Sequence, residues 1–178
     1  MMRFLTKPFR KFFRNEDGNA TLEFSILFVP MFSTLMWSAE IGMIHLNHSM
    51  LERALDMTVR ELRLGTGTAP QHDQIRDMIC DRAMFIEDCD TNVRLEMVRI
   101  DPYNWTNPPT NADCIDATQT IEPVRSFVAG ASNELMFLRV CAKFDPILPH
   151  IGLSRGLDLD GGAQFPLIAT AAFVQEPR

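Results

Sequence analysis

The hydrophobic pattern near the N-terminus predicts a helix that crosses a membrane. From Phe24 to Ala39 no charged residue occurs, and the apolar run reaches Leu46 if Glu40 is included. The uncharged part is slightly shorter than the ~20 residues that a helix needs to cross the hydrocarbon, whereas the longer run suffices. We therefore expect a transmembrane helix over residues 19–46, with Glu40 near the far interface, where a carboxylate can reach water.

The same helix should continue beyond the membrane. Leu51, Leu55 and Leu62 recur at helical spacing, and the segment 65–67, Gly-Thr-Gly, should end the helix. Pro30 should kink it, which membrane helices tolerate. The product would be one helix of roughly 40 residues and about 60 Å, apolar all round in its first half and amphipathic in its second. Asp56 and Arg60 have the spacing of an i,i+4 ion pair.

The remaining pattern predicts a second helix and a small sheet. An apolar stripe indicates a helix from about Pro70 to Phe85, with Pro70 in its first turn. Alternation with a period of two predicts antiparallel strands around residues 93–97, 136–144 and 165–173. The expected fold class is α+β, with a long N-terminal helix, a second helix and a small antiparallel sheet.

The charges along the chain predict its orientation in the membrane. The net charge is −6, yet residues 1–18 hold five Lys or Arg against two acidic residues, a net +3, so that the remainder carries −9. By the positive-inside bias, residues 1–18 form a basic cytoplasmic leader and residues 47–178 a periplasmic domain. A cleaved signal peptide is not expected, because the apolar run is too long. The only candidate cleavage site with small residues, Trp37-Ser38-Ala39, also contains a bulky Trp. Nucleic acid should be repelled by the acidic part.

All four cysteines, an even number, lie in the predicted periplasmic domain. An even count in an exported domain suggests two disulfides, and four cysteines allow three pairings. We expect Cys80 to pair with Cys89 and Cys114 with Cys141, since the first pair closes a small loop and the second anchors a long one. The spacings do not fit a zinc ribbon or a thioredoxin-type redox site.

Catalytic and metal-binding motifs are not evident, so we expect no enzyme, cofactor or metal site. His45 and His48 share a helix face but lack further ligands, so solvated interfacial histidines are the favoured interpretation. His72 and His150 are isolated in the sequence. The segment Asp158 to Gly162 has too few acidic ligands for a calcium loop, and a polar turn is favoured.

The residues around Glu23 resemble a processing site. A glycine followed five residues later by Glu-Phe and a retained apolar helix, here Gly18, Glu23 and Phe24, is similar to the cleavage site of type IV prepilins. The resemblance implies that a membrane prepilin peptidase cuts between Gly18 and Asn19. Glu23 could then neutralise the new amine of Asn19, its own or a neighbour's, and set axial register, because a mis-registered subunit leaves a buried charge unpaired.

The wider layout resembles the TadE-like family of the Tad (Flp) pilus system. The resemblance covers about residues 14–64 and includes Val29-Pro30, Glu40-Ile41-Gly42 and Leu51-Glu52-Arg53-Ala54, with a late segment from Phe144 to Pro149. It implies a minor pilin or pseudopilin of the bacterial inner membrane that supports pilus assembly and surface adhesion. Its expected partners are the prepilin peptidase, other pilins or pseudopilins and the inner-membrane assembly platform.

Two other functional classes are alternatives for this sequence. The chain could be an unprocessed single-span anchor that displays a periplasmic binding domain. The recognition surface would then be the segment Asp101 to Asn133, rich in Pro, Asn and Thr, since loops this long are usually functional or mobile. A membrane-tethered enzyme is the least favoured class, because no catalytic motif supports it.

Overall fold

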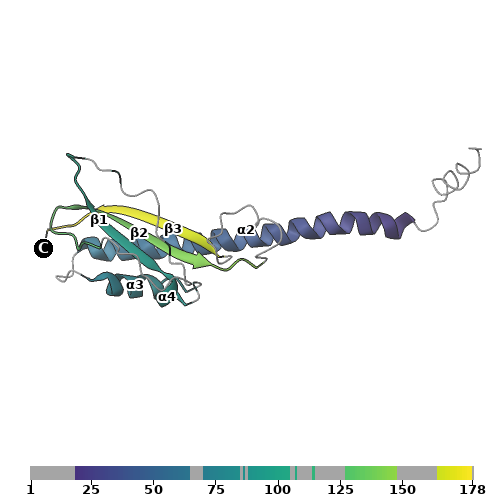
Figure 1. Ribbon diagram of the computed structural model, residues 1–178, viewed down its shortest axis with the longest axis horizontal. Helices are drawn as coiled ribbons and strands as arrows, with labels where there is room; N and C mark the ends of the chain where they lie inside the picture. The colour runs from purple at the N-terminus through teal and green to yellow at the C-terminus, as the bar shows by residue number, and fades with distance from the viewer. Residues whose placement is uncertain are drawn as a thin grey trace, which may run out of the picture. The chain divides into compact units, whose positions relative to one another are not determined.

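The fold is α+β, as the sequence predicts. The computed structural model describes residues 19–64, 70–84, 86, 88–104, 107, 114, 127–147 and 164–177. A long helix, α2 (Asn19–Leu64), is followed by α3 (His72–Cys80) and α4 (Cys89–Asn92), and then by the strands β1 (Arg94–Ile100), β2 (Leu135–Phe144) and β3 (Phe165–Val174) (Figure 1). The chain divides into two compact units, and their boundary falls inside α2, between Ala39 and Glu40.

The long helix contains 46 residues, more than the sequence pattern predicts. Pro30 lies inside it, where its ring removes one backbone hydrogen bond. Near the end of α2, the Gln175 side chain donates a hydrogen bond to the carbonyl of Leu62, 2.8 Å away. This carbonyl is one of the last four of the helix, which lack a partner within it. A side chain that directly follows β3 therefore supplies a hydrogen-bond donor to the C-terminal end of α2.

The three strands form one antiparallel sheet in the order β1-β2-β3. The register places Leu95 opposite Val140, and Val140 opposite Ala169. Alternate residues of each strand therefore point to one face, as the period-two pattern predicts. The three strand predictions are confirmed, with ends that differ by a few residues.

The core of the second unit lies between this face and two helices. The helix α2 contributes one stripe of residues to this core, and α3 contributes two isoleucines. Each strand contributes the residues that point inward. Its fully buried members include Leu51, Leu55, Ile75, Ile79 and Leu138. The leucine stripe that predicts an amphipathic second half of α2 is thus the stripe that the sheet and α3 cover.

The second helix is shorter than predicted. It covers His72–Cys80 and not residues 70–85. The N–H of Ala83 donates to the carbonyl of Ile79, yet Asp81 and Arg82 already form a turn. Cys80 is bonded to Cys89, so the chain must fold back after the helix. The one-turn helix α4, which begins at Cys89, lies where the sequence indicates only a turn.

Candidate functional site

The predicted processing site lies at the start of α2. Gly18 is outside the described residues, and α2 is described from Asn19. Glu23 and Phe24 are both exposed helical residues. Glu23 follows Asn19 by four positions, so the two share a helix face about 6 Å apart along the axis. The carboxylate of Glu23 therefore lies about one helical turn from the backbone nitrogen of Asn19.

The part of α2 that precedes Glu40 presents its apolar side chains to the surroundings. Leu22, Phe24, Ile26 and Val29 are each 56–64% exposed. About 20 residues of α2 lie before Glu40, and at 1.5 Å per residue they span about 30 Å, the thickness of the hydrocarbon. By length and composition, α2 is able to cross a membrane.

Hydroxyl side chains along this part of α2 are bonded to its own backbone. Ser25 donates to the carbonyl of Thr21, and Ser33 donates to that of Val29, both at 2.8 Å. Thr34 and Ser38 make similar bonds to carbonyls three residues earlier. Each hydroxyl proton thus has a local acceptor, which lowers the cost of placing these residues in an apolar environment.

An aromatic row occupies one side of the same part of α2. The ring centroids of Phe24 and Phe28 are 5.3 Å apart, and those of Phe28 and Phe32 are 5.7 Å apart. The three rings recur every four residues, the spacing at which helical side chains contact one another. They give this part of the helix a continuous apolar surface of large area.

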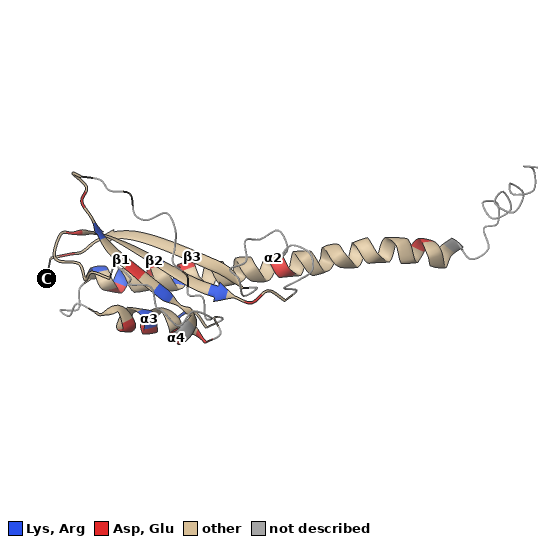
Figure 2. Cartoon of the chain, viewed as in Figure 1, with Lys and Arg blue, Asp and Glu red and all other residues tan. Residues whose placement is uncertain are grey.

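Charge is confined to the two ends of this part of α2. Between Glu23 and Glu40 the helix carries no charged residue, and the ribbon is uniformly tan there (Figure 2). Glu40 was expected to reach water, but its side chain is 1% exposed. The expectation is wrong because the second unit already covers α2 at Glu40. That unit begins six residues before the end of the expected transmembrane segment, so one side of α2 is covered from Glu40 onward, whereas Ile41, Met43 and Leu46 stay exposed.

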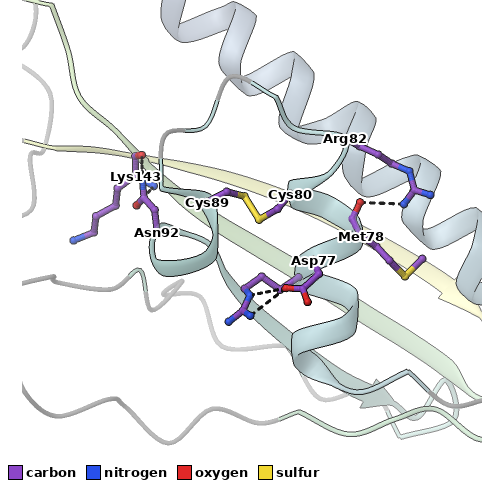
Figure 3. Close-up of a disulfide and its surroundings, with 8 residues drawn as sticks. Asp77, Met78, Cys80, Arg82, Cys89, Asn92 and Lys143 are labelled. Carbon is purple, nitrogen blue, oxygen red and sulfur yellow. Dashed lines mark hydrogen bonds and ion pairs between the residues drawn. A yellow bond between two sulfur atoms is a disulfide. The ribbon is translucent and has the colours of Figure 1, made fainter.

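The cysteines are joined as the spacing suggests, Cys80 to Cys89 and Cys114 to Cys141. Their Cα atoms are 5.7 Å and 5.5 Å apart, within the usual range for disulfides. The first disulfide links α3 to α4 (Figure 3). The second links Cys114, in the segment between β1 and β2, to the interior of β2.

The residues around the first disulfide attach it to the core. Asn92 donates to the carbonyl of Lys143 and accepts from its N–H, at 2.6 and 3.1 Å, so α4 is held against β2 (Figure 3). Arg82 donates to the buried hydroxyl of Thr58 and to the carboxylate of Glu61, at 3.1 and 2.6 Å. Neither contact was predicted, since each joins residues more than 20 positions apart.

The described histidines lie in different surroundings. Within the described residues, no group of three or more His, Cys, Asp or Glu is placed to hold a metal ion. His48 is not merely solvated as expected, because its Nε2 lies 3.0 Å from the carbonyl of Ile168 on β3. His45 is exposed, and His150 lies outside the described residues, as does the segment 158–162 that was weighed as a calcium loop.

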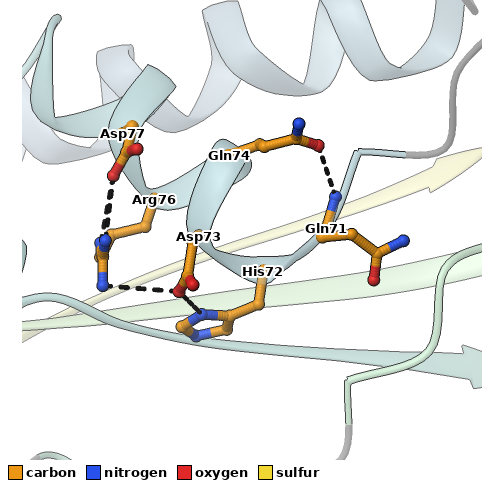
Figure 4. Close-up of polar contacts among 6 residues, drawn as sticks. All are labelled: Gln71, His72, Asp73, Gln74, Arg76 and Asp77. Carbon is orange, nitrogen blue, oxygen red and sulfur yellow. Dashed lines mark hydrogen bonds and ion pairs between the residues drawn. The ribbon is translucent and has the colours of Figure 1, made fainter.

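His72, isolated in the sequence, belongs to a polar group at the start of α3. Its Nδ1 lies 3.0 Å from Asp73, and Arg76 lies near both Asp73 and Asp77 (Figure 4). The hydrogen bond from His72, and then the charge of Arg76, hold the pKa of the Asp73 carboxyl below its usual value. At the helix start, the N–H of Gln71 donates to the side chain of Gln74, 3.0 Å away. These contacts stabilise the first turn of α3.

Most of the segment proposed as an alternative recognition loop, 101–133, lies outside the described residues. Tyr103, near its beginning, is 99% exposed. Near its end, Phe127 forms an isolated bridge with Met97 of β1, and the N–H of Val128 donates to the carbonyl of Met97. The end of the segment is thus attached to the edge of the sheet.

An ion pair that the sequence pattern does not reveal lies on the outer face of the sheet. The guanidinium of Arg139 donates to Glu96, with Nε 3.0 Å from the carboxylate, and only 7% of the arginine side chain is exposed. Glu96 and Arg139 are direct neighbours in the β1–β2 register. Their opposite charges would have predicted the pair, had the register been known.

Comparisons with known proteins add no further assignment. No protein-family model matches the chain, and no curated protein or solved structure matches it significantly.

Proposed function

We propose that the chain is a prepilin-like minor pilin or pseudopilin of the TadE-like type, which supports the assembly of an adhesive Tad pilus. The observation that carries the proposal is the contrast within α2, where an uncovered apolar stretch begins at Asn19 and gives way at Glu40 to a helix face buried in a folded unit. A subunit of this kind needs both parts, one to reside in the membrane and one to act outside it.

Glu23 has a defined role in the proposal. After cleavage behind Gly18, the amine of Asn19 becomes the N-terminus of α2, one helical turn from the Glu23 carboxylate. The positive end of the helix dipole adds to the charge of that amine. In a lipid or a helix bundle, an amine without a carboxylate costs several kcal/mol, so Glu23 favours the arrangement in which one neutralises the other.

The remaining parts of the chain follow from this role. The basic leader stays in the cytoplasm, where the peptidase cuts, and the unit from Glu40 onward lies in the periplasm. The chain's partners are the peptidase, other pilins or pseudopilins and the inner-membrane platform. It has no catalytic role and needs no cofactor. The two disulfides support the proposal, because disulfides persist in the periplasm and are rare in the cytosol.

The test is co-expression of the full chain with a Tad-type prepilin peptidase, followed by intact mass and N-terminal sequencing. We expect an N-terminus at Asn19 and the loss of residues 1–18. Gly18→Leu should block cleavage. Gly42→Ala is the matched control, because an added Cβ at Gly42 meets nothing within 4 Å. It should be cleaved like the wild type.

Two outcomes bear against the proposal. An N-terminus that remains at Met1 with an active peptidase would show that the chain is not a substrate, and would favour the single-span anchor. Normal pili in a strain that lacks the chain would exclude a role in assembly. Glu23→Gln should fail either in cleavage or in assembly, and assembly at the wild-type level would contradict the role given to Glu23.

A further inference from the structure

A second apolar stripe runs along α2, on a side that the core does not use. Met36, Met43, Met50, Met57 and Leu64 recur every seven residues. Within the second unit, Met43, Met57 and Leu64 are 40%, 37% and 63% exposed. Leu46, which follows Met43 by three residues, is 43% exposed, and Met50 is half-buried. Residues spaced by three and four in this way form one continuous seam on a helix.

This seam is separate from the buried face of α2. The core takes Leu51, Ala54, Leu55, Thr58 and Leu62 from the same turns, and these are at most 7% exposed. At 100° per residue, the two stripes are centred roughly 110° apart around the helix. One stripe is therefore covered by the chain itself, and the other is left exposed on an otherwise folded unit. An apolar seam of this length on a folded protein usually marks an interaction site.

Two arginines interrupt the seam. Arg53 and Arg60 occupy the positions that alternate with the methionines, and both are exposed. The ion pairs that involve this part of α2 within the described residues join Glu52, Glu61 and Arg63 to other groups, and include neither arginine. The pair between Asp56 and Arg60 that the sequence predicts is therefore not formed. Both guanidinium groups are available to carboxylates of another molecule.

The arginines also decide between possible occupants. A second copy of the chain, packed in parallel and in register through the same seam, as two copies anchored in one membrane would be, places arginine against arginine. Like charges that face each other across an interface oppose association. A helix with carboxylates at these positions would instead be attracted. Methionine is suited to such a surface, because its flexible side chain adapts to different apolar partners.

We propose that residues 43–64 of α2 form a docking surface for an α-helix of a different protein, with apolar residues at seven-residue spacing and carboxylates opposite Arg53 and Arg60. Its side chains would pack between the methionines as in a coiled coil. This contact would let α2 associate with a partner helix beyond the part that lies in the membrane. It goes beyond the proposed function and does not depend on cleavage after Gly18.

The test uses the full chain in lipid nanodiscs and two synthetic helical peptides. The peptides are about 28 residues long, since shorter isolated helices are marginal. Both carry leucine at seven-residue spacing, and they differ in having Glu or Lys at the positions that face the arginines. We expect the Glu peptide to bind about tenfold more tightly than the Lys peptide. In the Lys peptide, two exposed ion pairs with Arg53 and Arg60 are replaced by two repulsions. The double variant R53E/R60E should reverse the preference.

A second set of variants removes the apolar part of the seam. Met43→Gln with Met57→Gln should abolish binding of the Glu peptide without a change in Tm, because both side chains are exposed and Gln resembles Met in length and helix propensity. Met84→Gln is the matched control, because Met84 is 81% exposed and lies outside α2. It should bind like the wild type.

Three results would overturn the proposal. They are failure of the Glu peptide to bind, equal binding of the two peptides, and loss of binding in Met84→Gln. A photoreactive side chain at position 57 identifies the occupant. An adduct with the mass of chain plus peptide is expected, whereas an adduct of twice the 20.3 kDa chain would assign the seam to a second copy.

Discussion

The two parts of α2 form one continuous helix, but their side chains differ in exposure and in charge. Before Glu40, large apolar side chains are exposed, hydroxyls bond to their own backbone, and charge is absent between Glu23 and Glu40. After Glu40, one face is buried against the sheet and α3, and the exposed sides carry charged residues together with the methionine stripe. The difference shows that α2 is stabilised by backbone hydrogen bonds throughout, whereas the surroundings of its side chains change at one position.

The largest expected loss of stability comes from truncating a buried leucine, and it tests whether only the second part of α2 belongs to a packed core. Leu55→Ala should lower the free energy of unfolding by about 2–5 kcal/mol, because it leaves a cavity among fully buried neighbours. Leu35→Ala is the matched control, since Leu35 is 59% exposed, and it should change stability by less than about 0.5 kcal/mol. Chemical unfolding of the full chain in detergent measures both. Equal losses would mean that the first part also packs against protein.

Removal of a disulfide should affect the second part alone. The double variant Cys80→Ser with Cys89→Ser should lose about 2–3 kcal/mol, the range for a small closed loop. The loss should appear in the unfolding of the sheet and α3. The circular dichroism of α2 in detergent should keep the contribution of residues 20–39. A uniform loss of helix would contradict the independence of the two parts.

The Arg82 contacts test how the second part of α2 is held by the loop after α3. Arg82→Ala should cost about 1–3 kcal/mol, because the buried hydroxyl of Thr58 and the carboxylate of Glu61 lose a charged donor. Arg60→Ala provides the comparison, since Arg60 makes no ion pair with the described residues, and it should cost little. Thermal unfolding of the two variants separates a specific contact from a general loss of charge.

The smallest effect is a dependence on acid that belongs to the second part. The N–H of Ala131, and then Arg99, hold the pKa of the Glu134 carboxyl below its ordinary value of 4.5. Since the folded pKa is the lower one, this contribution is present above pH 4.5 and is lost as the pH falls through the folded pKa. Unfolding between pH 3 and pH 6 should show a weaker acid dependence in Glu134→Gln than in the wild type. An unchanged dependence would contradict the assignment.

Several elements could be predicted because their signals are local. The strands follow from period-two alternation, and the amphipathic half of α2 follows from the spacing of Leu51, Leu55 and Leu62. The cysteine count predicts two disulfides but leaves three pairings open, and the pairing chosen among them is the one that the structure has. The predicted processing site at Gly18 and Glu23 follows from the order of residues along the chain, and it remains a prediction.

Other features depend on residues that are distant in sequence. The burial of Glu40, the attachment of α4 through Asn92 and the pairing of Arg139 with Glu96 all require the register and packing of the sheet. The early end of α3 has the same origin, because the bond to Cys89 turns the chain back where the apolar pattern would have continued the helix.

The sequence by itself determined a long helix that ends at the segment 65–67, apolar all round in its first half and amphipathic in its second. Periodicity identifies apolar faces, because a helix places residues three and four apart on the same side. It does not say which face the rest of the chain will cover. Only the tertiary structure decided that the leucine stripe is buried and the methionine stripe is exposed, because the choice depends on where the sheet and α3 pack.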